Sequence, residues 1–405
     1  MKKSMGAVAL ALGFASAAEA QQVIYITGAT SFRADIYYAL RDMGLSVSAG
    51  ATTGNNTFTF SGVVNNTTIG TITNGSQGVN VQVFTALTGA AEGFNTLIND
   101  LSPVYTNVSG ASTTYINGAD LAFSDVQQQS TPYANSGTVN ELSSTDGLAS
   151  SFGAGIAVEP YVWVASADAN GKVNNVTPYI LNDIFPAGAL PLSFFDGVAS
   201  DANTSVVLVG RTNDAGTRII SELCDGLPTA SFDPAQGITQ YAVGGITGLN
   251  AGTFTGTYEE LGTGANFEGY ASSSTLAKAL NVRGAGYGIG YMSFNDAGSL
   301  LNGAQPINFQ GVSPFIGSTW TANSTPWNIQ GVENGQYYNW SYVHLFENTK
   351  VASTSFINKS FGPDLINAIE YEVVHPPAGT VQATDLIGRM NVNKGNDGGD
   401  INPGN

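Results

Sequence analysis

Three segments, far apart in the chain, each end a hydrophobic strand and open a helix with small or hydroxyl-bearing residues. They cover residues 23–32, 119–125 and 206–217, and read Val-Ile-Tyr-Ile-Thr-Gly-Ala-Thr-Ser-Phe, Ala-Asp-Leu-Ala-Phe-Ser-Asp and Val-Val-Leu-Val-Gly-Arg-Thr-Asn-Asp-Ala-Gly-Thr. The first turn of a helix carries unpaired backbone N–H groups at the positive end of the helix dipole. Such ends bind anions. With one arginine and one aspartate beside them, these segments predict a pocket for a small oxyanion.

Strands and helices alternate along the chain and must position these segments. Apolar runs predict strands at 23–26, 115–123, 155–165, 206–209, 288–294 and 340–346, and apolar residues at helical spacing predict helices at 31–43, 89–101, 178–185, 217–227, 270–280 and 355–373. Ser31 or Thr30 is a natural N-cap for the first helix. The alternation predicts an α/β protein with mainly parallel strands. In residues of about 51–83, apolar and polar side chains alternate instead, and Asn-Gly and Asn-Asn turns separate the alternating runs. This pattern predicts an inserted β-meander or long hairpin.

The composition restricts the possible partners. The formal net charge is −17, with 30 acidic and 13 basic residues among 405. Nucleic acid and anionic membranes are therefore not expected as partners. Charged residues make up only 11% of the chain, and an acidic protein does not gather anions by long-range attraction. Any anion site must therefore work through local dipoles and hydrogen bonds.

The first twenty residues have the pattern of a secretory signal peptide. A basic start at Lys2 and Lys3 precedes an apolar run, and Ala-Glu-Ala ends it at Ala20. We expect cleavage after Ala20 and a periplasmic or secreted protein. Cys224 is the only cysteine, so the chain has no lipid-anchor cysteine at the cleavage site and no internal disulfide.

The order of these segments resembles the periplasmic phosphate-binding proteins, the substrate-binding components of phosphate import transporters. Gly-Ala-Thr-Ser-Phe at 28–32 is similar to the family's first loop, Asp-Leu-Ala-Phe-Ser-Asp at 120–125 to its third, and Arg-Thr-Asn-Asp-Ala-Gly-Thr at 211–217 to its fourth. The second loop falls at 87–93, with Thr88 near the expected serine. Leu-Asn-Asp-Ile-Phe at 181–185 and Gly-Ile-Gly-Tyr at 288–291 match as well, so the resemblance covers about 23–300.

The resemblance implies a two-lobed periplasmic binding protein fold of type 2. Its first lobe would comprise residues 21–155, with the β insertion at about 51–83, and 306–385. Its second lobe would comprise 156–305, and 386–405 would form an irregular tail. A ligand would bind in the cleft between the lobes, and the loaded protein would dock on the permease of an ABC transporter. We expect a monomer without cofactor or metal.

The expected ligand-binding residues follow from the matched loops. They are Thr30, Ser31, Phe32, Thr88, Ser124, Asp125, Arg211, Gly216 and Thr217. Arg211 offers a planar fork for two oxygens. Asp125, when ionised, can accept a hydrogen bond only from a ligand that carries a proton, which favours hydrogen phosphate over sulfate. Two residues depart from the family pattern: Asn213 cannot form the family's ion pair with Arg211, and Ala215 lacks a hydroxyl donor. Arg33 follows Phe32 and could restore a donor.

Other functions find little support in the sequence. The chain has no Gly-x-Ser-x-Gly, no His-Glu-x-x-His and no Walker loop, and its two histidines, His344 and His375, are far apart. His344 lies in an aromatic strand and is expected to be structural. We therefore expect no enzyme. The alternative is a secreted or surface-associated protein that uses the same fold for a structural or interaction role and has a vestigial pocket.

Overall fold

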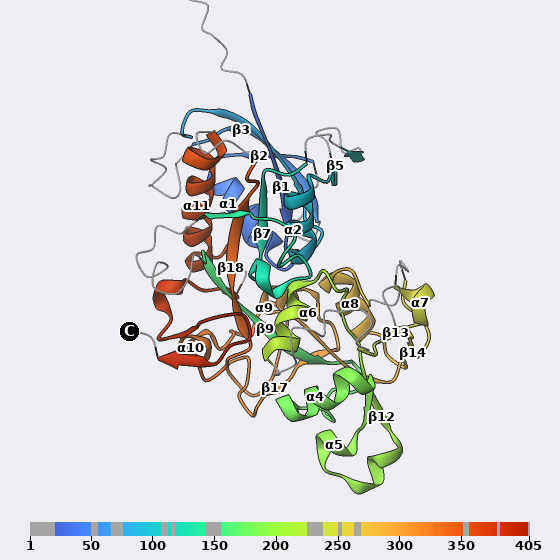
Figure 1. The fold of residues 1–405 in the computed structure, drawn as a ribbon. Helices are drawn as coiled ribbons and strands as arrows, with labels where there is room; N and C mark the ends of the chain where they lie inside the picture. The colour runs from blue at the N-terminus through green and yellow to red at the C-terminus, as the bar shows by residue number, and fades with distance from the viewer. Residues whose placement is uncertain are drawn as a thin grey trace, which may run out of the picture.

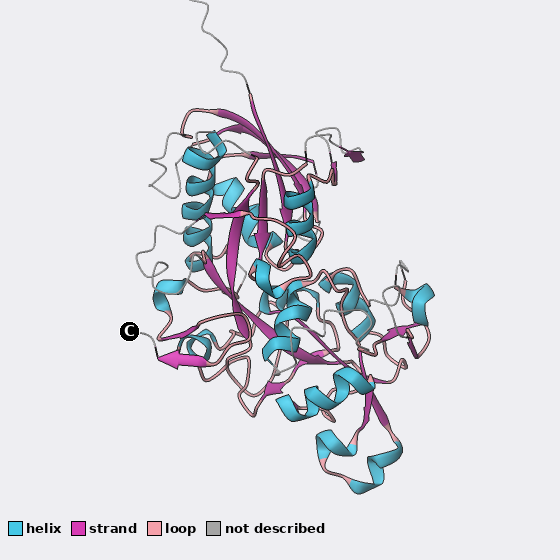
Figure 2. Cartoon of the chain, in the orientation of Figure 1, coloured by secondary structure: helices cyan, strands magenta, loops and turns pink. Residues whose placement is uncertain are grey.

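The computed structural model describes residues 21–49, 56–65, 76–106, 112–114, 118–142, 155–224, 238–249, 253–262, 269–350, 356–378 and 381–403. The proposed signal peptide and residues 66–75 of the expected β-meander lie outside the described residues. Two lobes share one sheet, which has twelve strands in the described part of the chain (Figures 1 and 2). The order along the main path is β11-β12-β15-β9-β18-β7-β1-β4-β3-β2.

The first lobe, at the top of Figure 1, contains the N-terminal elements of the chain, from β1 to β8. Its elements are β1 (Gln22–Gly28), α1 (Arg33–Asp42), β2 (Ser46–Ala49), β3 (Thr57–Val63), β4 (Asn80–Ala86), α2 (Ala90–Asn99), β5 (Val104–Thr106), β6 (Ser112–Thr114), β7 (Leu121–Ser124) and β8 (Asn140–Leu142). The strand β1 runs parallel to β4 and β7, while β3 and β2 add antiparallel neighbours. The β segment expected as an insertion therefore extends the main sheet at its edge.

The second lobe, at the bottom of Figure 1, has a parallel pair at its centre, β12 and β15. Its elements are β10 (Asn175–Val176), α4 (Pro178–Ala187), β11 (Ala189–Pro191), α5 (Ser193–Asp196), β12 (Ser205–Leu208), α6 (Gly216–Cys224), β13 (Tyr241–Val243), α7 (Gly245–Gly248), β14 (Tyr258–Glu260), α8 (Ser273–Leu280), β15 (Tyr287–Ser293), α9 (Phe294–Leu300), β16 (Gln305–Pro306), β17 (Asn308–Phe309) and α10 (Ile329–Glu333). The α/β class predicted from the sequence is confirmed, with parallel strands in the centre of both lobes and antiparallel strands around them.

Two long strands connect the lobes. They are β9 (Ala157–Ala165) and β18 (Trp340–Glu347), and both are buried along their whole length. One half of each strand pairs with the other strand, while the second half of β9 pairs with β15 and the second half of β18 pairs with β7. Figure 1 shows them crossing where the two lobes meet. Any change in the angle between the lobes must therefore act on these two strands.

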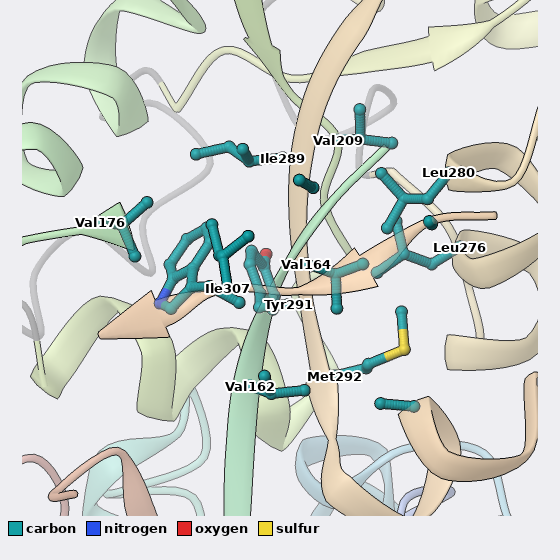
Figure 3. Close-up of a cluster of buried hydrophobic side chains, with 14 of the residues drawn as sticks. Val162, Val164, Val176, Val209, Leu276, Leu280, Ile289, Tyr291, Met292 and Ile307 are labelled. Carbon is teal, nitrogen blue, oxygen red and sulfur yellow. The ribbon is translucent and has the colours of Figure 1, made fainter. Parts of the chain in front are cut away.

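Each lobe has its own apolar core. In the first lobe, α1 and α11 (Gly362–Val374) cover one face of the sheet, and α2 covers the other. The side chains of β7 show this arrangement, since successive residues of a strand point to opposite faces. Leu121 and Phe123 pack with α1 and α11, whereas Ala122 packs with α2. The larger core belongs to the second lobe, and Figure 3 shows Val164, Ile289 and Met292 at its centre.

Two boundaries differ from the expectation. Residues 306–339, which the sequence assigned to the first lobe, contribute Ile307, Trp327 and Tyr337 to the core of the second lobe, so the chain returns only along β18. The expected irregular tail contains an antiparallel pair, β19 (Val392–Lys394) and β20 (Ile401–Pro403). Ile387 and Met390 of this tail are buried in the larger core.

Candidate functional site

The loops that follow β1, β7 and β12 meet where the lobes touch. All three strands belong to parallel pairs, and ligands of α/β proteins bind at the carboxyl ends of such strands. The close approach of the first two loops depends on Gly28, which has a φ of +111°. A β-carbon at this position would lie 1.9 Å from the carbonyl oxygen of Phe123. Glycine is therefore needed for the contact that brings Thr30 and Ser31 beside Asp125.

Ser31 lies between two buried carboxyl groups. Its Oγ is 3.0 Å from Oδ2 of Asp125 and 3.0 Å from Oε2 of Glu159, so the single hydroxyl proton serves one of them at a time. The Tyr161 hydroxyl donates to the same Asp125 oxygen at 3.1 Å and lies 2.9 Å from Oγ of Ser341. The predicted N-cap role of Thr30 or Ser31 is wrong: Phe32 occupies the N-cap position, and no side chain caps the helix.

Burial raises the pKa of both carboxyl groups. Loss of hydration raises the pKa of Glu159 well above its ordinary value, and the nearby Asp125 charge raises it further. The pKa of Asp125 is also raised by burial, but hydrogen bonds from Ser31 and Tyr161 and the Arg211 charge oppose this rise. The pair therefore holds a proton on Glu159 more readily than on Asp125.

Arg211 is fixed by the second lobe and reaches the first. Its side chain donates from Nε to the carbonyl of Tyr270 at 3.1 Å, from Nη1 to Oγ of Ser273 at 2.6 Å, and from Nη2 to the carbonyl of Ala271 at 3.2 Å. A further bond from Nη2 to Oγ1 of Thr30, at 3.3 Å, crosses between the lobes. These acceptors replace the ion pair that Asn213 cannot form. Four of the five guanidinium N–H groups thus have partners among the described residues.

The backbone of Arg211 is held as firmly as its side chain. The amide of Arg211 donates to the Tyr291 hydroxyl, and its carbonyl accepts bonds from Nη1 of Arg218 and Nε2 of Gln240. Burial lowers the pKa of Arg211, and the charges of Asp296, Tyr291 and Asp125 oppose this effect. The guanidinium is therefore a preorganised donor at the contact of the lobes.

The N-terminus of α6 faces Asp125. A β-carbon on Gly216 would lie only 1.7 Å from Oδ1 of Asp125, so the carboxyl group lies directly against the first residue of this helix. The same Oδ1 has no hydrogen-bond partner among the described residues. A carboxylate at the N-terminus of a helix occupies the position that a bound anion would take. Thr217, the next residue, is also buried.

Not every predicted residue joins this cluster. Thr30, Ser31, Asp125, Arg211 and Gly216 come together as described. The ring of Phe32 packs on Phe123 with centroids 5.9 Å apart. The Ser124 hydroxyl is used within its own turn, where it donates to the carbonyl of Val126 at 2.6 Å and accepts from the Val126 amide. Thr88 is exposed, and its hydroxyl lies 3.4 Å from that of Thr27.

Sequence reasoning missed Glu159, Tyr161 and Ser273. The first two lie on β9 within a continuous buried run, where a glutamate flanked by Val158 and Pro160 was the available signal, because buried acids in strands are rare. His344 pairs with Ser124 across the β18–β7 ladder, and its Nδ1 bonds to Glu141. In the described part of the chain, no group of three or more His, Cys, Asp or Glu residues has the arrangement of a metal site.

Comparisons with known proteins give matches among solved structures alone. No protein-family model and no curated protein match the chain. One similar structure is described as a phosphate ABC transporter substrate-binding protein with bound phosphate from Clostridium perfringens, at 13% identity and a TM-score of 0.49, covering 90% of this chain and 100% of that one. Another is an ABC-type phosphate transport receptor from Vibrio cholerae, at 12% identity and a TM-score of 0.41, covering 84% and 93%.

Proposed function

We propose that this protein is a solute-binding protein that captures a small oxyanion between its two lobes, with hydrogen phosphate as the first candidate. The proposal rests on one arrangement. Nη2 of Arg211, in the second lobe, lies 3.3 Å from Oγ1 of Thr30, in the first. Thr30 follows the carboxyl end of β1 and Arg211 that of β12, beside the loop that follows β7. The N-terminus of α6 and the Asp125 carboxyl group complete the set. An anion beside these groups would receive a charged donor and hydroxyl groups, with Asp125 holding the N-terminus of α6.

The chemistry of Asp125 favours a ligand that carries a proton. An ionised carboxylate can only accept hydrogen bonds, and fully ionised sulfate has no proton to give. Glu159, which holds its own proton readily, would donate to a ligand oxygen or to Ser31. Hydrogen phosphate offers both a proton and acceptor oxygens. It therefore satisfies this mixture of donors and acceptors better than sulfate does.

The proposed location and partner follow from the same hypothesis. We propose that residues 1–20 direct export, that the mature chain acts in the periplasm or outside the cell, and that it delivers its ligand to the permease of an ABC transporter as a non-enzymatic monomer. Among the described residues, no helix is long and apolar enough to cross a membrane.

A second candidate function is a structural or interaction role with a vestigial pocket. One observation favours it: the polar groups of the site are already paired with each other. Ser31 bonds to Asp125 and Glu159, and Arg211 bonds to protein oxygens. A ligand would have to replace some of these hydrogen bonds. Breaking them costs free energy, which weakens ligand binding.

Calorimetric titration of the purified protein separates the two candidates. We expect phosphate at pH 7 to bind with saturable heat and 1:1 stoichiometry, and sulfate to bind much more weakly. Arg283→Ala, which removes an exposed arginine outside the site, is the matched control for Arg211→Ala. The absence of binding by either oxyanion would reject the solute-binding proposal in favour of the structural role.

A further inference from the structure

The hydroxyl group of Ser31 faces two buried carboxyl groups and has only one proton to share between them. Its Oγ lies 3.0 Å from Oδ2 of Asp125 and 3.0 Å from Oε2 of Glu159, and the three residues are 1–3% exposed. If both carboxyl groups were ionised, one of these contacts would join two oxygens with no proton between them. The geometry therefore requires a proton on one of the two carboxyl groups.

The contacts of Asp125 leave no suitable place for that proton on this residue. Its Oδ2 accepts from the Tyr161 hydroxyl at 3.1 Å as well as from Ser31. Tyr161 in turn lies 2.9 Å from Oγ of Ser341, which can donate to it. Oδ1 lies against the first residue of α6, and a proton there would find no acceptor among the described residues. Asp125 is therefore the acceptor at the end of two hydrogen-bond chains.

The surroundings of Glu159 favour the neutral acid. Its Oε1 has no hydrogen-bond partner among the described residues, and a bare buried oxygen costs far more on a carboxylate than on a neutral acid. Burial raises the pKa of Glu159 well above its ordinary value, against one opposing hydrogen bond from Ser31. Three acids on other elements raise it further: Asp125 after β7, Asp35 on α1 and Asp296 on α9.

The two arginines of this region act on other acids. Nη2 of Arg33 lies 2.5 Å from Oδ1 of Asp296, and the charge of Arg211 lowers the pKa of Asp125. Among the described residues, Glu159 forms no ion pair. The arginines therefore stabilise the ionised forms of its neighbours and leave Glu159 without a counterion.

We propose that Glu159 is a positioning residue that carries a proton at neutral pH and donates it to Ser31, so that Ser31 donates to Asp125. This order of donation fixes the Ser31 hydroxyl and keeps Asp125 ionised. The second chain, from Ser341 through Tyr161, ends on the same oxygen of Asp125. The chains begin on β9 and β18, the two strands that connect the lobes.

The consequence for anion binding rests on the proposed function. An ionised Glu159 would add a negative charge beside the anion and would compete with Asp125 for the single Ser31 proton. The neutral acid avoids both effects. Loss of the Glu159 proton at alkaline pH should therefore weaken phosphate binding, which makes Glu159 the group through which pH acts on this site.

Proton release on unfolding tests the assignment without any ligand. A glutamate in the unfolded chain ionises near pH 4.5, so a protonated Glu159 releases its proton on unfolding at any pH between 4.5 and its raised pKa. Between pH 5.5 and 7.5, the stability of the wild type relative to Glu159→Gln should therefore fall as pH rises, with a slope of about one proton. The exposed change Glu259→Gln should keep the wild-type slope.

Infrared difference spectra observe the same proton directly. The spectrum of the wild type minus that of Glu159→Gln at pH 7 should contain the C=O band of a protonated carboxyl group and no carboxylate bands. Glu259→Gln supplies the reference spectrum for a glutamate in contact with water. Carboxylate bands in the Glu159→Gln difference, or equal stability slopes for the two proteins, would overturn the proposal.

A conservative and a disruptive change at position 159 test the positioning role. The amide of Glu159→Gln can still donate to Ser31, whereas Glu159→Leu leaves Ser31 without that donor. Folded Glu159→Leu should therefore bind phosphate about tenfold more weakly than Glu159→Gln does. Equal affinities of these two variants would show that Ser31 requires no donor from position 159, and the positioning role would be wrong.

Phosphate titrations at several pH values test the link to binding. The ratio of the wild-type affinity to that of Glu159→Gln cancels the titration of phosphate itself. This ratio should stay constant while the acid band persists and fall where the band is lost, and any other relation between the two would contradict the link. If no variant bound phosphate, the proposed function would be rejected, whereas the stability slopes and the infrared band would still decide whether Glu159 carries a proton.

Discussion

Gly216 and Asp125 approach so closely that no side chain fits between them: a β-carbon on Gly216 would lie 1.7 Å from Oδ1 of Asp125. The two residues come from different lobes and lie 91 positions apart in the sequence. Asp125 directly follows β7 of the first lobe, and Gly216 is the first residue of α6 in the second. Their contact therefore depends on the way the lobes meet.

Gly216→Ala should hold the lobes apart at this point. The added methyl group must displace Asp125 or open the contact, at a cost of about 1–3 kcal/mol, which is typical of overpacking. We expect weaker phosphate binding and a larger radius of gyration by solution X-ray scattering. Gly395→Ala, which adds a methyl group in open space, should leave both unchanged. Wild-type affinity in Gly216→Ala would show that the contact does not limit binding.

Arg211→Ala should weaken phosphate binding by about 2–5 kcal/mol, because it removes a buried charged donor from its partner. Arg211→Lys should also lose affinity, since an ammonium group cannot keep the three fork contacts to Tyr270, Ala271 and Ser273. Dissociation constants from calorimetry measure both effects, with Arg283→Ala as the exposed control. An unchanged constant for Arg211→Ala would place Arg211 outside the binding site.

The sequence predicted the parts of the site that lie at strand ends, because a strand followed by small or hydroxyl residues is a local pattern. Ser31, Asp125 and Arg211 were found in this way. Glu159 and Ser273 were not, because their roles depend on pairing between distant segments: Glu159 faces Ser31 across 128 residues, and Ser273 meets Arg211 across 62. Local patterns do not encode such pairings.

The sequence places a hydroxyl residue at the end of a strand but does not show which partner its hydroxyl group takes. Ser124 lies where it was expected, but its hydroxyl bonds within its own turn, as serine commonly does. The boundary at 306 was wrong for a similar reason. The loop-rich segment after it resembles a linker in sequence, and only the buried positions of Trp327 and Tyr337 show that it belongs to the larger core.

Lys394 should anchor the C-terminal segment. Its Nζ donates to the carbonyls of Tyr338 and Trp340 at 2.6 and 2.8 Å and lies 4.5 Å from the centre of the Trp340 ring. Lys394→Met keeps the length of the side chain but removes the charged donor to both carbonyls and the cation above the Trp340 ring, which costs about 1–3 kcal/mol. Chemical denaturation should show this loss. The exposed change Lys172→Met is the control, and equal stability of the two variants would contradict the anchoring role.

The protein should be more stable at mildly acidic pH than at pH 8. Burial raises the pKa of Asp35 from 3.8 to about 7, so the folded state keeps a proton that the unfolded chain releases near pH 4. The contribution of Asp35 to the free energy of unfolding is therefore largest below pH 4 and decreases as the pH rises towards 7. Asp385 has a pKa raised to about 7 and Asp120 one raised to about 6, mainly by burial, which adds to the trend.

Asp35→Asn tests one of these contributions at the contact of the lobes, where Asp35 accepts a hydrogen bond from Asn295. Melting temperatures between pH 4.5 and 8 should fall less steeply in this variant than in the wild type. The exposed change Asp400→Asn should leave the slope as it is. A wild-type melting temperature that rises over this range would contradict the assignment.

Asp125→Asn should change which anion the site accepts. In the wild type, Asp125 accepts from Ser31 and Tyr161, and an ionised carboxylate facing sulfate would place acceptor against acceptor. The amide supplies a donor of nearly the same shape, so sulfate gains a hydrogen bond and hydrogen phosphate loses its acceptor. We expect the preference for phosphate to fall by about 10- to 100-fold, which corresponds to about 1–3 kcal/mol for one unsatisfied group.

Competition binding at pH 7 measures this preference directly, with Ser124→Ala as the control for a neighbouring polar residue whose hydroxyl stays within its own turn. That control should keep the wild-type selectivity. If sulfate displaced phosphate from the wild type as well as from Asp125→Asn, Asp125 would not be the group that accepts the ligand's proton. Glu159→Gln would then identify whether the second carboxyl group takes that role, because it alone shares the Ser31 hydroxyl with Asp125 among the described contacts.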